Sequence, residues 1–171
     1  PIGWPSTGSY RLLDLVGIDT SDKVTKGVLQ SCPNDEYVKI LKTRETPKAT
    51  RFLLENNFLG NKTGQGFYKK TDERDEKGNR IILALDLNTL EYKPTQKSVI
   101  PVVGIAKKIE IMDKRIKEMI ASDENSGYFV RDYMCGLIAY AANRIFEITD
   151  DIHSIDDAMK AGYAWAYGPF E

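Results

Sequence analysis

Leu59-Gly60-Asn61-Lys62-Thr63-Gly64-Gln65-Gly66-Phe67-Tyr68 is the stretch around which the rest of this chain is organised. It holds three glycines within seven residues, which demands unusual backbone angles or close packing. Lys62-Thr63-Gly64 resembles a phosphate-binding P-loop only superficially. In a P-loop the lysine and the Ser/Thr follow the second glycine, and the loop follows a strand. Here a glycine follows the threonine and a helix is expected before the loop, which argues against nucleotide binding by this stretch.

The residues before this stretch have the apolar spacing of short helices. Leu13 and Val16 fall on one helical face. Asp19-Thr20-Ser21-Asp22 offers side chains that cap a helix N-terminus, and Pro47 suits a first helical turn. Four helices are therefore expected, over residues 8–17, 21–31, 34–42 and 47–57.

The residues after the glycine stretch predict a loop and then a hairpin. Lys69 to Arg80 is dominated by charge and is expected to be an exposed loop. Ile81 to Leu87 has the composition of a strand, and Asn88-Thr89 is expected to turn the chain into Leu90–Lys93. A small β-hairpin is therefore predicted at about 81–93.

The second half of the chain is expected to be helical. Lys107 to Ala121 alternates apolar and charged residues as an amphipathic helix does. A long helix is expected over 128–147, and Ser154-Ile155-Asp156-Asp157 is close to a capping box that opens a helix ending at Ala161, before Gly162. The prediction is a mainly α fold, a helical bundle with a small β-hairpin insertion.

Composition excludes several classes of partner and site. The net charge is −1, with 24 basic and 25 acidic residues, so no broad attraction to nucleic acid or an anionic membrane is expected. No apolar run approaches the length of a membrane span. Cys32 and Cys135 lie far apart in sequence, which favours a reducing cytoplasm over a disulfide framework. His153 is the single histidine, and its position just before an expected helix predicts a partly exposed residue rather than a metal ligand or catalytic base.

One pattern occurs twice, in Gly3–Arg11 and in Gly162–Glu171. Each copy has a glycine, a tryptophan, a second glycine, an aromatic residue two positions later and then a charge. The first copy continues into the helix expected over 8–17, whereas the second stops where such a helix would begin. We expect from this an interrupted repeat that belongs to a larger protein. The alternative is two unrelated glycine-aromatic loops.

These motifs together resemble one family. Leu59–Tyr68 resembles the "GxKTGxGFY" signature in the C-terminal helical domain of 3-hydroxyacyl-CoA dehydrogenases. Thr7–Thr20 is similar to that family's "GPFELADLVGLDT" segment, and Ala142–Ile145 is similar to its "NRI" helix. Ser154–Gly162 resembles "sIddidkAmk.G", and Gly168–Glu171 matches "GPFE". The resemblance implies a bundle of the 6-phosphogluconate/3-hydroxyacyl-CoA dehydrogenase C-terminal type.

The order of the matches is that of a tandem repeat. In one family unit the NRI helix comes first and the glycine signature last, but here the later part of a unit precedes the earlier part of another. We expect residues 1–97 to be the later part of a first helical unit, with the hairpin, and residues 98–171 to be the earlier part of a second. This order resembles the central region of multifunctional members, in which the dehydrogenase is joined to an enoyl-CoA hydratase.

The resemblance implies NAD-dependent oxidation of 3-hydroxyacyl-CoA to 3-ketoacyl-CoA in fatty-acid β-oxidation. NAD is expected to be bound by a domain outside this chain, so the chain alone is expected to be inactive. Asn143 matches the family's active-site asparagine, but it lies in the second unit, so a structural role between packed helices is the alternative. Lys62 and Thr63 are candidate contacts to the CoA part of the substrate, or else members of a loop that only passes over the helices.

The expected partners are an acyl-CoA substrate, the NAD-binding and enoyl-CoA hydratase domains of the same parent chain, and a second copy in a homodimer. No metal, nucleic acid or membrane is expected as a partner, and the expected location is the cytoplasm. A non-catalytic module for self-association or CoA-thioester binding is the alternative function.

Overall fold

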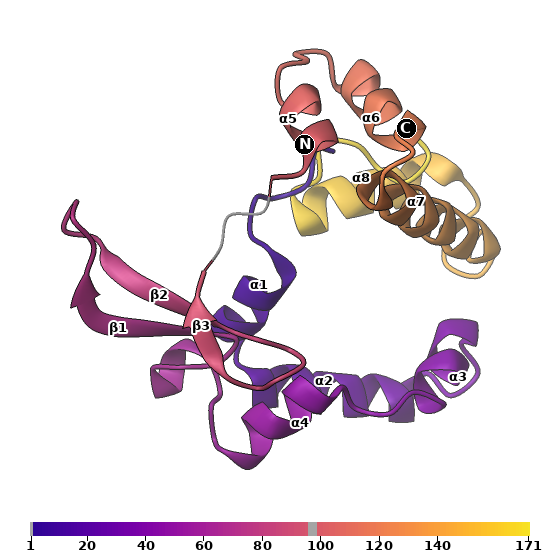
Figure 1. Cartoon of the computed structure of the whole chain (residues 1–171). Helices are drawn as coiled ribbons and strands as arrows, with labels where there is room; N and C mark the ends of the chain where they lie inside the picture. Colours follow the sequence, from indigo (N-terminus) through magenta and orange to yellow (C-terminus); the bar gives the residue numbers. More distant parts are fainter. Residues whose placement is uncertain (1, 96–98) are drawn as a thin grey trace. The chain divides into compact units, whose positions relative to one another are not determined.

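The computed structural model describes residues 2–95 and 99–171 and confirms the prediction of a mainly α fold with a small β-hairpin, which is part of a three-stranded antiparallel sheet. The described residues divide into two compact units, the sheet unit, residues 7–95, and the helical unit, residues 99–171 with 2–6. The elements of the sheet unit are α1 (Ser9–Val16), α2 (Ile18–Ser31), α3 (Glu36–Lys42), α4 (Lys48–Glu55), the 3-10 turn η1 (Asn61–Thr63), β1 (Tyr68–Arg74), β2 (Arg80–Leu85) and β3 (Tyr92–Pro94) (Figure 1). Those of the helical unit are α5 (Pro101–Ala106), α6 (Met112–Ala121), α7 (Asn125–Asn143) and α8 (Ile152–Tyr163).

A single glycine joins α1 to α2. Gly17 follows the last residue of α1 and precedes the first residue of α2, with φ at 100°. That angle is accessible to glycine at little cost, so the chain changes direction within one residue. The expected start of the second helix at residue 21 is therefore wrong, because Ile18 already begins α2 and the polar cluster at 19–22 lies inside it.

The prediction of an exposed loop from Lys69 to Arg80 is wrong for its first part, because these residues form strand β1. Tyr68–Arg74 pairs antiparallel with β2, in the register Tyr68 opposite Ala84 and Lys69 opposite Leu83. The charged side chains of β1 stay exposed while its backbone is paired, so charge alone did not indicate a loop. The predicted hairpin is present as β2 and β3, and β1 extends it to three strands in the order β1-β2-β3.

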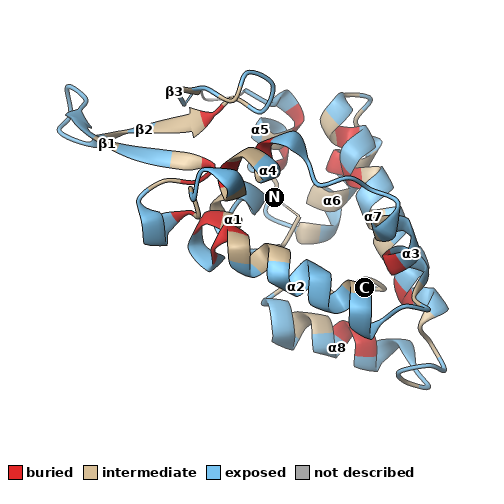
Figure 2. Cartoon of the chain, turned by 90° about the horizontal axis from the view of Figure 1, so that it is seen from below, coloured by how far each residue is buried: buried red, intermediate tan, exposed pale blue. Residues whose placement is uncertain are grey.

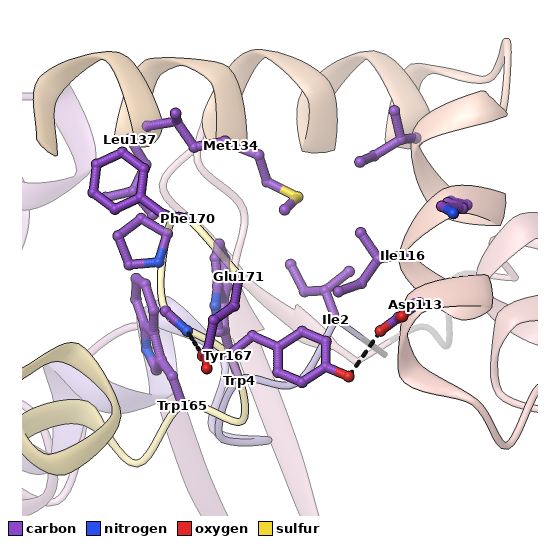
Figure 3. Close-up of a pocket in the computed structure, with 15 residues that line it drawn as sticks. Ile2, Trp4, Asp113, Ile116, Met134, Leu137, Trp165, Tyr167, Phe170 and Glu171 are labelled. Atoms are coloured by element: carbon purple, nitrogen blue, oxygen red, sulfur yellow. Dashed lines mark hydrogen bonds between the residues drawn. The ribbon is translucent and has the colours of Figure 1, made fainter. Parts of the chain in front are cut away.

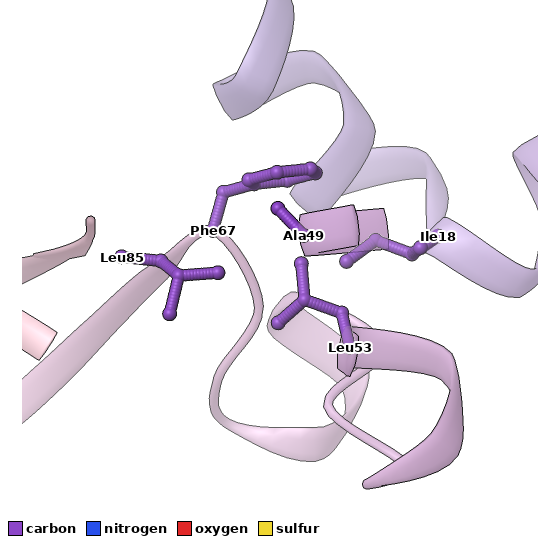
Figure 4. Close-up of a cluster of buried hydrophobic side chains, with 5 residues drawn as sticks. All are labelled: Ile18, Ala49, Leu53, Phe67 and Leu85. Carbon is purple, nitrogen blue, oxygen red and sulfur yellow. The ribbon is translucent and has the colours of Figure 1, made fainter. Parts of the chain in front are cut away.

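The core of the sheet unit gathers α2, α4 and the sheet around one aromatic ring. Ile18, Ala49, Leu53, Phe67 and Leu85 form a buried cluster, shown in Figure 4. By contrast, most residues of α2 beyond its first turns are exposed (Figure 2).

Two helices expected in the second half have other boundaries. The helix predicted over 107–121 is present only from Met112 to Ala121, as α6, and a separate helix, α5, precedes it at Pro101–Ala106. The Arg115 guanidinium stabilises the connection between the two helices by donating to the carbonyl oxygen of Ile109 at 2.9 and 2.7 Å. The helix predicted over 128–147 is α7, which begins earlier, at Asn125, and ends earlier, at Asn143.

The last helix begins earlier than predicted because Asp151 caps it. The Asp151 carboxylate accepts the backbone N–H of Ser154 at 2.8 Å, so α8 starts at Ile152. His153 therefore lies in the first helical turn, not before it, and is exposed. Gly162 does not stop α8; the helix continues to Tyr163, and Ala164 takes the left-handed conformation that ends it, with φ at 53°.

The helical unit brings the two tryptophans of the repeated pattern together. Its core contains Val102, Ala106, Met119 and Val130. Trp4 and Trp165 stack with ring centroids 4.9 Å apart, and the N–H of Ala166 donates to the carbonyl oxygen of Gly3 at 2.9 Å. Thus parts of both copies of the pattern pack against each other within one unit. None of the described helices has the length and apolar character that crossing a lipid bilayer requires.

Candidate functional site

A buried aspartate is the anchor of the glycine-rich stretch in the sheet unit. Asp14, on α1, is 1% exposed. Its Oδ1 accepts the N–H of Phe67 and its Oδ2 accepts the N–H of Tyr68, each at 2.8 Å. Hydrogen bonds from backbone amides to a carboxylate are charge-assisted and satisfy a group that is costly to bury unpaired. The pair of bonds therefore ties α1 to the point where the glycine stretch enters β1.

Two of the glycines are required by the closeness of this anchor. A Cβ on Gly66 would lie 2.1 Å from Oδ1 of Asp14, and a Cβ on Gly60 would lie 2.4 Å from its carbonyl oxygen. Gly60 also has φ at 96°, and Gly64 has φ at 81°. The expectation that these glycines serve unusual backbone angles and close packing is confirmed.

Thr63 holds the turn together through its hydroxyl group. The Thr63 Oγ1 atom accepts the N–H of Leu59 at 2.8 Å and lies 3.1 Å from the carbonyl oxygen of Gln65, to which it donates. One hydroxyl thus bridges the two ends of the turn. The structure places Thr63 in the loop's own framework, and its contact to a substrate stays a prediction.

Lys62 lies on the exposed side of the same turn and pairs with Asp19 of α2. The Lys62 side chain is 44% exposed, and its ammonium group forms an ion pair and hydrogen bond with the Asp19 carboxylate. This hydrogen bond lowers the pKa of Asp19. Nearby, Arg11 donates to the side-chain oxygen of Asn61 at 3.5 Å. Two cationic side chains therefore reach this turn, an arrangement that suits an anion.

Tyr92 of β3 closes the site from the side of the sheet. Its hydroxyl donates to the carbonyl oxygen of Gly66 at 2.5 Å. Burial, with a further contribution from the negative charge of Asp14, raises the pKa of Tyr92 to about 12. The hydroxyl therefore remains a protonated donor at neutral pH. Tyr10 packs on Phe67 with ring centroids 4.6 Å apart, which covers the anchor from α1.

Asn143 belongs to the other unit, and the structure does not bring it together with Lys62 and Thr63 in one compact unit. It is the last residue of α7 and is exposed. The role of Asn143 in catalysis stays a prediction. Among the described residues, no group of three or more His, Cys, Asp or Glu side chains is arranged to hold a metal ion.

The helical unit contains its own cavity, of about 460 Å³, bounded by α6, α7 and residues on both tryptophan segments (Figure 3). Its polar edge includes Asp113, whose carboxylate accepts the Tyr167 hydroxyl at 2.7 Å. Next to it a second buried aspartate, Asp156, is 3% exposed and accepts the N–H of Phe170 at 2.9 Å. A Cβ on Gly168 would lie 2.2 Å from the Asp156 Oδ1 atom.

Sequence reasoning missed the residues that shape both regions. Asp14, Asp156 and Tyr92 were not among the candidate residues. A signal for Asp14 was available, because it interrupts the apolar run Leu12–Val16. An acid in an apolar helical run is rarely buried unless it is paired, so such a position predicts an internal carboxylate with hydrogen-bond donors. Tyr92 carries no comparable signal, since its role depends on the pairing of β2 with β3.

Residues 1–70 match the family model described as "3-hydroxyacyl-CoA dehydrogenase, C-terminal domain". The chain is 35% identical over 170 residues to a protein of Bacillus subtilis (strain 168) named "Probable 3-hydroxyacyl-CoA dehydrogenase". The aligned region covers 99% of this chain and 20% of that protein. It is also 32% identical over 171 residues to a "Putative fatty acid oxidation complex trifunctional enzyme" of Rickettsia felis. That aligned region covers 99% of this chain and 21% of the relative. The chain thus spans about a fifth of the length of the curated relatives it matches.

Proposed function

Because residues 1–70 belong to the C-terminal domain family of 3-hydroxyacyl-CoA dehydrogenases, we propose that this chain is the helical part of a longer fatty-acid oxidation enzyme. That enzyme oxidises 3-hydroxyacyl-CoA to 3-ketoacyl-CoA with NAD. The observation that carries the proposal is that the matched residues include Asp14 and the whole glycine turn that it anchors through Phe67 and Tyr68.

NAD is bound by another part of that enzyme. A dinucleotide site of the common type needs a parallel strand followed by a glycine-rich turn and a helix N-terminus. In the described part of this chain the sheet is antiparallel, and the glycine turn at 60–66 leads into β1. These residues therefore do not fit NAD.

The glycine turn contributes a wall of the acyl-CoA site in this proposal. CoA carries phosphates, and Lys62 with Arg11 offers two cations at an exposed edge whose backbone is fixed by Asp14 and Thr63. To meet a phosphate, the Lys62 ammonium exchanges its bond with Asp19 for one with the ligand.

Replacing Lys62 in the longer enzyme tests this assignment. Lys62→Ala is expected to raise KM for acetoacetyl-CoA about tenfold, because a charge-assisted hydrogen bond is worth about 1.5 kcal/mol or more. The matched control is Lys70→Ala, another exposed lysine of the same unit, which should leave KM unchanged. Equal effects of the two substitutions would show that Lys62 has no special contact.

Asn143 in the longer enzyme separates catalysis from structure. If the asparagine binds the reacting end of the substrate, Asn143→Ala lowers kcat about a hundredfold or more, the usual effect of removing a group that stabilises developing charge. Normal kcat with lower stability would assign it to the packing of α7 and contradict the catalytic role.

The chain by itself is proposed to be inactive, with the active site completed by the NAD-binding and enoyl-CoA hydratase domains of the same polypeptide. Mixing the purified chain with NADH and acetoacetyl-CoA should leave the nicotinamide absorbance unchanged. Turnover by the chain alone would contradict this. We further propose a cytoplasmic location.

Self-association is the second candidate function, and exposed apolar side chains on both units favour it. Leu12, Leu15, Phe129 and Tyr163 are each more than half exposed in this structure. We propose that a second copy covers part of this surface as a homodimer. Sedimentation equilibrium at micromolar concentrations checks it. If the chain is a monomer that binds acetoacetyl-CoA, the homodimer is contradicted and the CoA site is supported. If it is a dimer that does not bind acetoacetyl-CoA, a module that serves only self-association is favoured.

A further inference from the structure

The sheet unit has a hollow of its own, of about 400 Å³, lined by residues of α1 to α4. This volume lies within the range of about 300–1,000 Å³ that is usual for small-molecule sites. One part of its wall is apolar and consists of Leu13, Ile18, Leu29, Leu41 and Phe67. Ile18 and Phe67 also belong to the buried cluster of Figure 4, so the core of the unit holds this part of the wall in place.

The polar part of the wall comes from the chain between α3 and α4 and from the first turn of α4. Arg44, Thr46 and Thr50 line the same hollow. A guanidinium offers five N–H donors, and each threonine hydroxyl can donate one more hydrogen bond. The hollow therefore has an apolar side and a side rich in donors, which suits a ligand with one apolar end and one end that accepts hydrogen bonds.

The other charged side chains that line the hollow are already paired. The Asp22 carboxylate lies 2.7 Å from the Lys26 ammonium. Glu45 lies 3.8 Å from the Arg51 guanidinium, and its side chain is 92% exposed, so it extends into solvent. Within residues 2–95 and 99–171, the Arg44 guanidinium has no carboxylate within ion-pair distance. Among the described lining residues, Arg44 is therefore the cation that is left for a ligand.

The segment that carries Arg44 is strongly basic. Residues 39–51 contain five basic residues and one acidic residue, although the whole chain has a net charge of −1. Such a segment attracts an anion and repels a cation. A planar guanidinium binds a carboxylate through two parallel hydrogen bonds, whereas a doubly charged phosphate calls for more than the single unpaired cation that lines this hollow in the described structure. The charge therefore favours a carboxylate.

We propose that this hollow binds a medium-length alkyl chain that ends in a carboxylate. The alkyl chain lies on the apolar wall, and the carboxylate accepts hydrogen bonds from the Arg44 guanidinium, with the hydroxyls of Thr46 and Thr50 as further donors. The site is distinct from the glycine turn, to which the CoA contact of Lys62 is assigned, and its ligand is a free carboxylate and not a CoA thioester.

Titration of the chain with octanoate and with decanoate, followed by methyl NMR, tests the proposal. The methyl signals of Leu13, Leu29 and Leu41 should shift in a saturable way. Each methylene that becomes buried should tighten binding about fourfold, so decanoate should bind at least about tenfold more tightly than octanoate. Shifts confined to Met134 and Leu137 would place the ligand in the cavity of the helical unit and would overturn the proposal.

Matched arginine substitutions test the carboxylate end of the site. Arg44→Gln should weaken decanoate binding about tenfold, because a charge-assisted hydrogen bond is lost. Arg80 is an exposed arginine of the same unit that does not line the hollow, so Arg80→Gln should change the affinity less than about twofold. Decanol has the same alkyl chain without the charge and should bind the unchanged chain and the Arg44→Gln variant equally. An equal loss for decanoate and decanol would contradict the pairing with Arg44.

Competition with decanoyl-CoA separates this site from the CoA contact. Lys62→Ala should leave decanoate binding unchanged, whatever it does to the KM for acetoacetyl-CoA, so the two proposals can fail independently. Decanoyl-CoA that displaces labelled decanoate more readily than unlabelled decanoate does would assign the hollow to the thioester and overturn the proposal. So would the lack of a saturable shift up to about 1 mM decanoate, or shifts that follow the concentration of the chain alone.

Discussion

Asp14 and Asp156 are buried carboxylates that bind backbone amides in the two units, and they differ in how far away in sequence those amides lie. Each is almost fully buried, each binds the amide of a phenylalanine, and each lies against a glycine that leaves no room for a Cβ. Asp14 accepts two amides from a segment more than 50 residues away in sequence, whereas the bond from Phe170 to Asp156 spans 14 residues. Asp14 therefore closes the longer loop, and we expect its unit to depend on its carboxylate more strongly.

The largest effect is expected from Asp14→Ala. The substitution leaves the amides of Phe67 and Tyr68 without their acceptor, at about 1–3 kcal/mol each, so the sheet unit should lose about 2–6 kcal/mol of its free energy of unfolding. Urea titration followed by the NMR amide signals of Phe67 and Tyr68 measures it. A loss below about 1 kcal/mol would mean that water replaces the carboxylate. It would contradict the expectation that the sheet unit depends on Asp14 more strongly than the helical unit depends on Asp156.

Gly66→Ala should come next, because it tests the same anchor from the other side. A Cβ there would lie 2.1 Å from the Asp14 carboxylate, so the anchor must shift, at a cost of about 2–3 kcal/mol. Gly64→Ala is the control, since nothing lies near its Cβ position and only its φ of 81° is strained, at about 1–2 kcal/mol. A loss in Gly66→Ala no larger than that in Gly64→Ala would contradict this, because it would mean that the Asp14 anchor accommodates the added Cβ without a further cost.

Asp156→Ala should cost less, about 1–3 kcal/mol, because one amide loses its acceptor. The only tryptophans, Trp4 and Trp165, both lie in the helical unit, so tryptophan fluorescence during urea unfolding reports on that unit. The fluorescence midpoint should move for Asp156→Ala and stay for Asp14→Ala. Movement in both variants would show that the two units unfold together.

The smallest effect is a loss of stability in strong base, governed by Tyr92. Its pKa is raised from 10.0 to about 12 in the folded chain, so the unfolded chain loses this proton first as the pH rises. The stabilisation is complete below pH 10 and is lost between pH 10 and about 12. Tyr92→Phe should flatten the pH dependence of the sheet unit's unfolding over that window. An unchanged slope would show that another group titrates there.

The contrast between the units also shows what the sequence could predict. The glycines at 60, 64 and 66 carried their own evidence, because their number and spacing require unusual backbone angles. The strand β1 did not, since its charged side chains give no periodic signal and its existence depends on pairing with β2. Likewise the start of α8 could not be predicted, because both Asp151 and Ser154 are suitable N-cap residues and the structure uses Asp151.

The site followed the same rule. Lys62 and Thr63 could be named as candidates because they lie within a recognisable local pattern, and their contact with a substrate stays a prediction. The apolar run around Asp14 indicates that its carboxylate is buried, but it does not say which amides bind it, because these come from a segment more than 50 residues away in sequence. The donation from Tyr92 to Gly66 needs the third strand in place as well.

The most direct test of the central claim is the dehydrogenase activity of the native protein captured from its source cells with an antibody raised against these 171 residues. We predict that NADH-dependent reduction of acetoacetyl-CoA is captured together with a polypeptide about five times the mass of this chain, as its one-fifth coverage of the relatives implies. Capture of a polypeptide of this chain's own mass, without that activity, would contradict the account.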